Sequence, residues 1–537
     1  MKKTLSVILA IALMATMLAA CGSKAPAAQP ETPVAAVQPD ANFNAEGYPV
    51  VKEPIELNAA TYCGTMSGDF NEMQIFKELT EKTGVKVNFD MIPPTAWPER
   101  KSLMLASNEL PDLIYGGDIT MNDQIKYSRS GMFLPLNDLV DKYAPNIKKM
   151  LDDHPTLKNA MTLSDGNYYS LPFYDEFLPE NIPDTMFINK TWLDKLGLDV
   201  PTTTEEFYEV LKAFKDKDPN GNGEPDEIPL TYIANNTNLG DFSLWGSFGV
   251  LDNSKHLMVK DGKVLFSLTQ DGYKEGIQYF NKLYKEGLLD FEVFTQDRTQ
   301  YASKGSQEEM KVGVLVAYTP ENFLGAERTY NDYIDLLPLK GPNGDQLWNR
   351  YDMGYYTDRV VITSANKHPE ATIRWLDEQF AEEMSVRLHW GEVGKNIERT
   401  ENGWKILSEA PEGMSVDEYR FKTVPAYHAP GVILAETYDK IELATDKAMK
   451  AERYKKYDPY AAQEYLPAVT LTSEEQQEIS TIFVDIDGYV KSMKAKWVSG
   501  ESDVEADWDK YVETLGKMQV DRYVEIYQAA YDRAMGK

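Results

Sequence analysis

Cysteine and histidine are scarce in this chain of 537 residues. Cys21 and Cys63 are the only cysteines, and the five histidines are scattered with no HExxH pair among them: His154, His256, His368, His389 and His428. Without such a pair, a zinc site is not expected. We expect each histidine to be an ordinary surface or core residue.

The chain also lacks the short motifs of several enzyme classes. It has no GxSxG, which argues against a serine hydrolase, and no GxxxxGK[ST] or usable GxGxxG, which argues against a nucleotide-binding enzyme. An extracellular glycosidase would need two carboxylates facing one bond. Nothing in the sequence singles out such a pair among its 85 Asp and Glu residues.

Positive charge is in short supply as well. The 55 Lys and Arg residues are outnumbered by 85 Asp and Glu, which gives a formal net charge of −30. Such a chain repels nucleic acid and anionic membranes, so neither is expected as a partner. Aromatic residues are plentiful instead, with 32 Tyr, 20 Phe and 9 Trp. The composition suits a folded protein with an aromatic-rich recognition surface, and the length allows two or more cores.

The N-terminus carries a targeting segment. Lys2 and Lys3 precede an apolar run over residues 5–18, and the sequence Leu-Ala-Ala-Cys ends at Cys21. This ending resembles the lipobox of bacterial lipoproteins. The resemblance implies removal of residues 1–20, attachment of a diacylglyceryl group to Cys21, and a protein anchored by lipid alone on the extracellular face of the cell membrane. Cys63 would then have no disulfide partner, and we expect it to be a small buried side chain.

Strands and helices alternate after a flexible tether. Residues 21–47 are rich in Ala, Pro and Gln and predict the tether. Apolar alternation predicts strands at 55–59, 85–91 and 112–115, and helical spacing predicts helices at 71–83 and 97–107. Further strands are expected near 168–174, 312–318 and 359–363, and helices at 136–151, 271–288 and through the C-terminus. This order predicts an α/β fold with a mostly parallel sheet covered on both faces.

Residues 216–227 carry oxygen-bearing side chains at every second position, in the sequence Asp-Lys-Asp-Pro-Asn-Gly-Asn-Gly-Glu-Pro-Asp-Glu. The glycines let the backbone curl tightly, so that six or seven oxygens can surround a hard cation. A helix with a capping box from Thr202 to Glu205 precedes the loop, and Ile228-Pro229-Leu230 follows it, where proline forbids an immediate helix. We therefore expect helix, loop and strand rather than a true EF-hand, holding a structural Ca²⁺.

Two registers fit the ion. Counting from Asp216 gives the EF-hand spacing closed by Glu227. Counting from Asp218 gives six ligands, with Glu224 contributing its backbone carbonyl: Asp218, Asn220, Asn222, Glu224, Asp226 and Glu227. The second register is preferred because it uses both Asn side chains and the adjacent acidic pair. A solvated turn is the alternative, since Asp, Asn, Gly and Pro are also common turn formers.

Several stretches together resemble the extracellular solute-binding proteins of ABC importers, family 1, and among them the longer lipoproteins of the LipO and alginate-binding type. The resemblance rests on residues 76–87, 103–107 continuing into 110–115, 186–193, the 218–227 loop and 521–523. These stretches follow the order and spacing of the family over nearly the whole mature chain.

The resemblance implies a two-lobed, periplasmic-binding-protein-like α/β fold with a helix-rich C-terminus. Such a monomer closes its cleft on an oligosaccharide and presents it to an ABC transporter permease, without catalysis. The chain would cross the hinge near residues 171–176, 350–354 and 395–401, which makes both lobes discontinuous. Lobe 1 would then contain residues 48–172 and 352–395, and lobe 2 would contain residues 173–351 and 396–537.

Sugar recognition needs flat aromatic faces for the apolar side of the ring and planar polar groups for the hydroxyls. Trp390 belongs to a Trp-Gly-Glu-Val-Gly stretch that is similar to a Tyr-Gly-x-Glu-Gly loop of the family. The other candidates lie at predicted strand ends or crossings. The candidate ligand-binding residues are Tyr62, Tyr115, Tyr174, Glu176, Trp245, Tyr318, Arg350, Asp352, Tyr355, Trp390 and Glu392. For each aromatic, core packing is the alternative.

Two other functions stay open on the sequence alone. One is a surface lipoprotein that binds peptides or serves a sensor, and the other is an extracellular glycosidase. A response to peptides without a response to saccharides would indicate the first, and turnover of a sugar would indicate the second.

Overall fold

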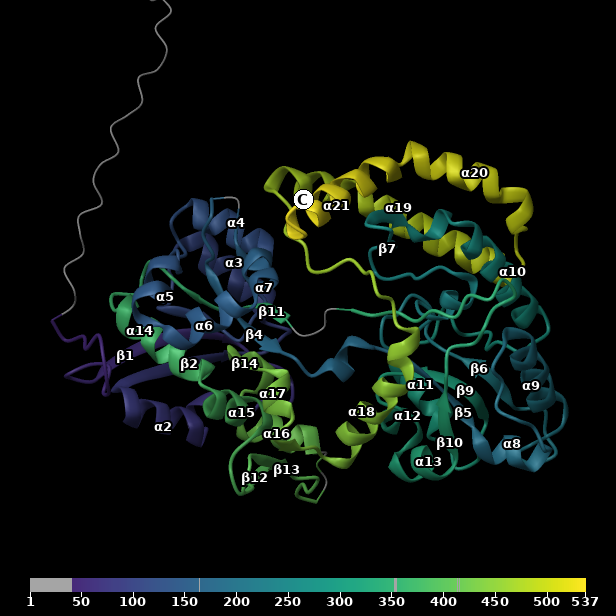
Figure 1. The fold of residues 1–537 in the computed structure, drawn as a ribbon, viewed down its shortest axis with the longest axis horizontal. Helices are drawn as coiled ribbons and strands as arrows, with labels where there is room; N and C mark the ends of the chain where they lie inside the picture. The colour runs from purple at the N-terminus through teal and green to yellow at the C-terminus, as the bar shows by residue number, and fades with distance from the viewer. Residues whose placement is uncertain (1–40, 164, 352–354, 413, 415) are drawn as a thin grey trace, which may run out of the picture. The chain divides into compact units, whose positions relative to one another are not determined.

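The computed structural model describes residues 41–163, 165–351, 355–412, 414 and 416–537. The predicted signal peptide, Cys21 and most of the predicted tether lie outside these residues, and so does Asp352. Residues 42–537 form one compact unit. Two larger sheets within this unit each have their own helices and hydrophobic core (Figure 1).

The folded part begins earlier than predicted. The backbone N–H of Asn44 donates to the carbonyl of Val50 at 2.8 Å, and Phe43 forms a β-bridge with Val51. The ring of Phe43 packs edge-on against Tyr143 with 5.1 Å between centroids. The tether prediction is therefore wrong for residues 42–47, because Phe43 and the two valines that follow pack on the first core.

The first sheet has six strands in the order β14-β4-β11-β3-β1-β2. All run parallel except β11, which is antiparallel to both of its neighbours. The bounds are β1 Ile55–Tyr62, β2 Val85–Ile92, β3 Leu113–Tyr115, β4 Ser170–Asp175, β11 Tyr355–Ile362 and β14 Gly431–Ile433. In β2, Val85, Val87 and Phe89 are buried and the residues between them are not. The predicted mostly parallel sheet is confirmed.

Helices cover both faces of this sheet. Leu113 and Ile114 are adjacent in β3 and belong to different hydrophobic clusters, because successive strand residues point to opposite faces. The helices are α2 Gln74–Thr83, α3 Trp97–Ser107, α4 Met121–Arg129, α5 Asn137–Tyr143, α6 Pro145–Asp153, α7 Pro155–Met161, α14 Pro369–Asp377, α15 Glu382–Trp390, α16 Val416–Thr423 and α17 Ala435–Tyr438. The single helix expected over 136–151 is two helices, since Pro145 disfavours helical backbone at Ala144.

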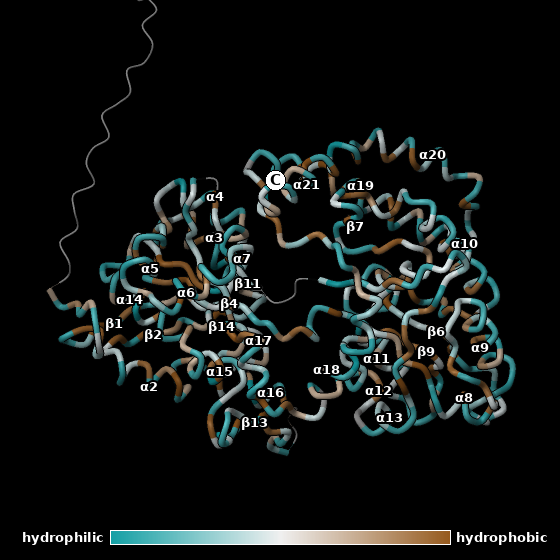
Figure 2. The backbone as a smooth tube through the Cα atoms, viewed as in Figure 1, coloured by the Kyte–Doolittle hydropathy of each residue, from teal (hydrophilic) through white to brown (hydrophobic). Residues whose placement is uncertain are grey.

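The second sheet has four strands in the order β10-β5-β9-β6. The bounds are β5 Thr185–Asn189, β6 Ile228–Thr231, β9 Val312–Ala317 and β10 Tyr333–Leu336. Every residue of β9 is buried, and Figure 2 shows hydrophobic colour along this strand. The accompanying helices are α8 Lys190–Leu196, α9 Thr204–Asp216, α10 Asp271–Lys285, α11 Arg298–Gly305, α12 Glu321–Leu324 and α13 Ala326–Asn331.

Two small sheets and the C-terminal helices complete the chain. The small sheets contain β7 Leu257–Lys260 with β8 Lys263–Phe266, and β12 Ile397–Arg399, β13 Trp404–Ile406 and β15 Ile441–Glu442. The C-terminal helices are α18 Thr445–Tyr457, α19 Ser473–Ser499, α20 Val504–Lys517 and α21 Val520–Ala534. Residues of α19 to α21 join the core of the second sheet, as the helical prediction required. In the described part of the chain, no helix is long and apolar enough to cross a membrane.

The predicted capping box of α9 is shifted by one residue. Thr203 and Glu206 cap α9 in place of Thr202 and Glu205, because adjacent threonines and adjacent glutamates made the pattern ambiguous in sequence. A second capping box, formed by Thr472 and Glu475, begins α19. The helices themselves were correctly predicted.

Strand pairing corrects the predicted hinge crossings. β4 ends at Asp175 in the first sheet, so the predicted boundary between residues 172 and 173 cuts a strand of that sheet. The predicted crossing at 395–401 is wrong, because this segment contains β12 and the chain afterwards contributes β14 to the first sheet, parallel to β4. The division into two lobes remains a prediction.

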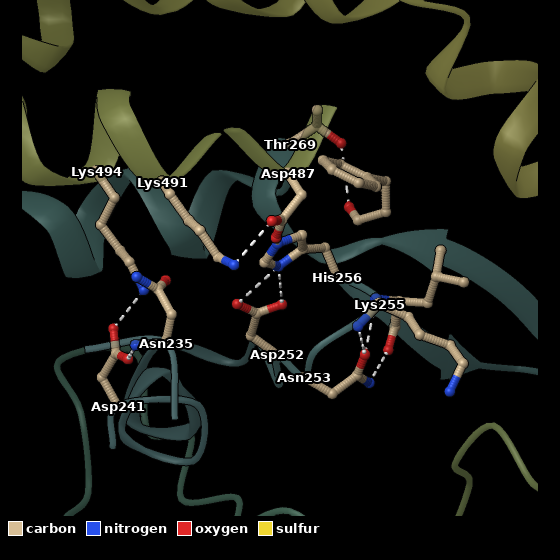
Figure 3. Close-up of polar contacts among 12 residues, drawn as sticks. Asn235, Asp241, Asp252, Asn253, Lys255, His256, Thr269, Asp487, Lys491 and Lys494 are labelled. Carbon is tan, nitrogen blue, oxygen red and sulfur yellow. Dashed lines mark hydrogen bonds and ion pairs between the residues drawn. The ribbon is translucent and has the colours of Figure 1, made fainter. Parts of the chain in front are cut away.

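A buried ionic network ties α19 to the loops around the second sheet (Figure 3). Lys494 pairs with Asp241 at 2.6 Å, and their side chains are 2% and 1% exposed. His256 bridges two carboxylates, with Nδ1 at 3.0 Å from Asp252 and Nε2 at 3.2 Å from Asp487. Burial lowers the pKa of His256, but the carboxylates of Asp252 and Asp487 together outweigh burial, so the pKa is raised. Removing one member of such a network would leave an uncompensated buried charge.

Candidate functional site

Segments far apart in sequence meet at one edge of the first sheet. β1, β3 and β4 end at this edge, the antiparallel β11 begins there, and the loop before β14 lies against it. We call this the carboxyl edge and define it as residues 62–64, 116–118, 174–176, 356–359 and 426–428. In open α/β sheets, ligands bind at the carboxyl ends of the strands.

Three tyrosines of the carboxyl edge present accessible rings. Tyr356 is 38% exposed, and Tyr62 and Tyr427 are half-buried. The rings of Tyr356 and Tyr427 are stacked, with 5.9 Å between centroids and 23° between planes. Tyr62 and Tyr427 both contact the ring of His428, at centroid distances of 5.7 and 4.5 Å. We call Tyr62, Tyr356 and Tyr427 the aromatic ledge.

Arg359 fixes the aromatic ledge to the neighbouring loops. Its guanidinium lies 4.7 Å from the ring centroid of Tyr356, and its Nη1 donates to the carbonyl of Tyr427 at 3.1 Å. Asp358 pairs with this guanidinium and accepts the backbone N–H of Asp118 at 2.9 Å. Because Arg359 is 7% exposed, its charge is used mainly within the protein.

The structure brings three predicted contacts to the carboxyl edge. Tyr62, Tyr174 and Glu176 all lie there and are half-buried. The hydroxyl of Tyr174 donates to Oε1 of Glu176 at 2.8 Å, and Oε2 of Glu176 accepts the backbone N–H of Ala435 at 2.8 Å. Their role in ligand binding stays a prediction.

Three other predicted contacts are packed in the core. Tyr115 and Trp245 have no exposed surface, and Trp390 is 5% exposed. Trp245 packs against Tyr273 and Phe280 at centroid distances of 5.0 and 4.9 Å. Core packing, the alternative for every candidate aromatic, holds for these three. We correct the prediction accordingly, because their rings offer no open face to a sugar.

Tyr318 and Arg350 do not belong to the segments that form the carboxyl edge. Tyr318 follows β9 of the second sheet and is half-buried, and the ammonium of Lys450 lies 3.1 Å from its ring centroid. Arg350 pairs with Asp458. The Arg350 guanidinium is thus already engaged by a carboxylate of the protein.

Of the last three predicted contacts, only the side chain of Glu392 is described. Glu392 pairs with Lys395 at 2.8 Å. Asp352 lies outside the described residues, and of Tyr355 only the backbone, paired with Tyr174, is described.

Sequence reasoning missed Tyr356, Tyr427 and Arg359. Tyr356 is adjacent to the predicted Tyr355, and neighbouring strand residues face opposite sides, so the choice between them needed the strand register. Tyr427 lies between Pro425 and Pro430 in a segment without helical or strand periodicity. The two prolines were the available signal of a rigid loop.

The 218–227 loop connects α9 to β6, as predicted. The Asp218 carboxylate accepts the backbone N–H groups of Gly221 at 2.8 Å, Asn222 at 3.1 Å and Gly223 at 3.0 Å. Asp218 itself has a φ of 45°, in the left-handed region. These bonds curl the backbone of the loop around one carboxylate.

Two further carboxylates of this loop bear on its fit to a cation. Lys311 Nζ lies 2.7 Å from Oδ2 of Asp226, and this ammonium lowers the pKa of Asp226. The buried Oε1 of Glu227 has no hydrogen-bond partner. Burial and the negative charges of Asp218 and Asp226 raise the pKa of Glu227. An orphaned carboxyl oxygen next to two other carboxylates fits a divalent cation with oxygen ligands.

The oxygen atoms of the loop are not arranged around a common point as metal ligands would be. Among the described residues, no three His, Cys, Asp or Glu side chains are grouped as metal ligands. Instead, the amide groups of Asn220 and Asn222 donate to Asp226 at 3.0 and 3.2 Å, beside the Lys311 ammonium. Rotating each amide would present its oxygen in place of its NH₂ group.

One family model matches the chain. It is described as "Bacterial extracellular solute-binding protein" and matches residues 67–384, which is more than half of the sequence. The matched segment includes most of the first sheet, the 218–227 loop and the whole second sheet.

The chain is similar to characterised relatives over most of its length. It is 35% identical over 536 residues to the "Fructooligosaccharide ABC transporter substrate-binding protein FusA" of Streptococcus pneumoniae, covering 96% of each chain. It is 27% identical over 337 residues to "Lipoprotein LipO" of Bacillus subtilis, covering 60% of this chain and 63% of LipO.

Solved structures of the same S. pneumoniae protein match the whole folded part. FusA in complex with kestose superposes with a TM-score of 0.79 at 35% identity, covering 90% of this chain and 100% of that chain. The FusA EF-hand mutant in complex with fructo-nystose gives a TM-score of 0.78 at 34% identity, with the same coverage. The predicted fold class, an α/β solute-binding fold with a helical C-terminus, is confirmed.

The predicted absence of catalysis is supported by these matches and not by anything missing from the structure. The matched family and the relative that matches over nearly the full length are binding proteins of transporters rather than enzymes. The chain belongs to the bacterial extracellular solute-binding protein family.

Proposed function

We propose that this protein captures a fructooligosaccharide outside the cell and delivers it to the permease of an ABC importer. The observation that carries the proposal is the 35% identity to a fructooligosaccharide-binding relative over 96% of both chains. A solved structure of this relative contains kestose. The carboxyl edge supplies a surface of the kind that such a ligand needs.

The aromatic ledge is the proposed contact surface on the first sheet. A sugar ring presents C–H groups on one face and hydroxyls around its rim, so it pairs with flat aromatic faces flanked by polar groups. The stacked rings of Tyr356 and Tyr427 offer such faces. Tyr174 and Glu176 lie on the same edge and are the proposed polar contacts.

The second sheet would close over this surface. In the proposed cleft, Tyr318 at the end of β9 faces the ligand from the second lobe, and hinge bending brings the two lobes together. A ligand that binds only the folded protein stabilises it, and above the dissociation constant this stabilisation grows with the logarithm of the ligand concentration. The ligand would then be presented to the permease by the closed form.

The 218–227 loop is proposed to hold a structural Ca²⁺ in the register that begins at Asp218. The support is the unpaired Oε1 of Glu227 beside the carboxylates of Asp218 and Asp226. The FusA relative has an EF-hand, and its EF-hand mutant was crystallised with a sugar. We infer that calcium stabilises the fold without contacting the ligand.

Cys21 is proposed to carry the lipid that anchors the protein outside the cell. The LipO relative is a lipoprotein, and the sequence ending at Cys21 has the lipobox form. Substituting Cys21 with Ser should release the protein from membranes. Recovery of the variant in the membrane fraction after removal of peripheral proteins would contradict this assignment.

The function is tested by calorimetric titration of residues 22–537 with kestose and nystose. Maltotriose, a trisaccharide built from glucose alone, is the matched control. We expect saturable binding of the fructooligosaccharides, no binding of maltotriose and no change in the sugar after incubation. Binding of peptides without saccharides, or release of shorter sugars, would replace this function by a peptide-binding or a hydrolytic one.

A further inference from the structure

His428 occupies a buried position directly behind the aromatic ledge. It is 1% exposed and ends the short 3-10 helix Ala426–His428, which lies between Pro425 and Pro430. Ala426 has a φ of 52°, in the left-handed region that a residue with a side chain rarely adopts. Such strain persists only where surrounding contacts hold it, and it is concentrated at functional sites.

The two ring nitrogens of His428 contact two different loops. Nδ1 lies 3.1 Å from the carbonyl oxygen of Gly116, after β3, and Nε2 lies 3.2 Å from the backbone nitrogen of Gly64, after β1. A carbonyl can only accept and an amide N–H can only donate. The contacts therefore require a neutral imidazole with its proton on Nδ1, so that Nε2 can accept from Gly64.

These loops fit closely around the aromatic ledge. A Cβ atom on Gly116 would lie 2.1 Å from the carbonyl oxygen of Tyr62, and one on Gly117 would lie 2.6 Å from the guanidinium of Arg359. Glycine is required at both positions, which also have φ values of 99° and 103°. A shift of either loop would therefore move Tyr62 or Arg359, and Arg359 in turn holds Tyr356 and the backbone of Tyr427.

We propose that His428, with its proton on Nδ1, is a positioning residue for sugar binding that fixes residues 62–64 and 116–117 and so sets the spacing of the three rings of the aromatic ledge. His428 does not touch the ligand, because its ring is buried behind Tyr62 and Tyr427. The inference rests on the proposed function and names the element that pre-organises its site.

A histidine that only filled space would be replaceable by another ring of similar size. His428→Phe keeps the volume and the aromatic contacts but removes one hydrogen bond from each loop. The Gly64 N–H then has only the Ser67 hydroxyl, at 3.1 Å, and the Gly116 carbonyl has only the Arg359 guanidinium, at 3.4 Å. His428→Gln has one acceptor oxygen and one donor NH₂ group, so it can satisfy both loops. The pair of variants separates hydrogen-bonded positioning from packing.

The test is calorimetric titration of both variants and the parent chain with kestose. We expect His428→Phe to bind at least about tenfold more weakly, because each loop loses one of its two hydrogen bonds and is held less firmly, and His428→Gln to bind within about threefold of the parent. His368→Phe, at the N-terminus of α14, is the matched control and should bind like the parent. Equal affinity of a folded His428→Phe and the parent would overturn the proposal.

Two further measurements do not depend on the ligand. In ¹⁵N-histidine spectra of the parent chain, we expect His428 to show a protonated Nδ1 and an unprotonated Nε2, and we expect the Gly64 amide to exchange more rapidly in the Phe variant. A proton on Nε2 overturns the proposal even if His428→Phe does not fold. If the parent binds no saccharide while the Nδ1 proton and the slow Gly64 exchange are observed, the proposed function fails and the loop positioning stands.

Discussion

The edge of the first sheet and the body of the second sheet use similar residues in opposite ways. At the carboxyl edge, Tyr356 is 38% exposed and is held by a buried arginine. Around the second sheet, Trp245 has no exposed surface and lies near the buried ammonium of Lys494, 5.6 Å from the ring centroid. We propose that aromatic rings serve recognition in the first region, whereas in the second they pack the core.

This difference indicates which substitutions should change ligand affinity and which should change the free energy of unfolding. The second region contains the buried Lys494–Asp241 pair and the loop proposed to hold calcium, and we expect both to stabilise the fold. Apart from Tyr318, the proposed ligand contacts lie in the first region. Substitutions in the second region other than at Tyr318 should change the free energy of unfolding with little effect on affinity, and substitutions on the aromatic ledge should do the reverse.

The largest expected effect is on stability. Trp245→Ala removes a fully buried indole from the core and should lower the free energy of unfolding by about 3–5 kcal/mol. The affinity of the remaining folded protein for kestose should stay within about threefold of the parent, because Trp245 is not on the carboxyl edge. Denaturant unfolding and calorimetric titration give the two quantities.

Trp245→Phe is the control, since it keeps a ring in the core and should lose less stability than the Ala variant. A loss of kestose affinity in Trp245→Phe at unchanged stability would break the separation between the two regions. It would return Trp245 to the set of ligand contacts predicted from the sequence.

The second prediction concerns His428, a residue of the first region that should also contribute to the free energy of unfolding. The dependence of this free energy on pH tests that contribution. Burial, supported by the charge of Arg359, lowers the pKa of His428 from 6.5 to about 4, against an opposing effect of its bond to Gly116. Between these values the unfolded chain binds a proton that the folded chain does not. Stability from His428 therefore falls as pH drops from 6.5 to 4, by at most about 3 kcal/mol.

The measurement is the difference in unfolding free energy between the parent and His428→Gln, from pH 4 to 7. Burial raises the pKa values of Asp175 and Asp184 to about 7, so these two residues destabilise the fold as pH rises. Their contribution is the same in both proteins and cancels when the two unfolding free energies are subtracted. Arg359, Tyr62 and Tyr427 are the charged or titratable groups that face His428, and they are the same in both proteins. A difference that is flat with pH would show that His428 is protonated equally in both states.

The two candidate sites differ in how far they could be predicted from the sequence. The 218–227 loop is contiguous, so its ligand spacing and its flanking helix and strand were readable from local chemistry. The aromatic ledge is assembled from β1, β11 and the loop before β14. The sequence does not indicate that Tyr356 and Tyr427 are neighbours. Strand order and register bring their ring centroids to 5.9 Å. For the same reason the sequence could not show that Tyr115 is a core residue. It lies at the end of a predicted strand, but only the folded sheet shows that its side chain points into the core.

Calcium should have the next largest effect. At about a hundredfold its dissociation constant, the ion should add roughly 2.7 kcal/mol to the free energy of unfolding, and Asp218→Ala with Glu227→Ala should abolish this gain. Asp216→Ala is the matched control, because Asp216 is the last residue of α9 and is a ligand only in the other register. Loss of the calcium effect in the control would establish the EF-hand register instead.

A substitution of Lys311 tests the calcium site further. Its ammonium lies 2.7 Å from Asp226, where a bound cation would compete with it. Lys311→Met should therefore strengthen calcium binding by roughly three- to tenfold, measured by competition with a chelating dye. Unchanged or weaker binding would mean that Asp226 is not a ligand, and kestose affinity should not change in either case.

Substituting Tyr356 is the most direct test of the aromatic ledge, and it should change the free energy of unfolding least. Tyr356→Ala removes a partly exposed ring, so the free energy of unfolding should fall by less than about 1 kcal/mol. Kestose affinity should fall about tenfold, since one stacking face is lost and Arg359 no longer has a ring beside it. Tyr356→Phe keeps the face and should bind within about threefold of the parent. If Tyr356→Ala bound kestose normally and unfolded much more readily, Tyr356 would be a packing residue like Trp245, and the sugar would have to contact another part of the carboxyl edge.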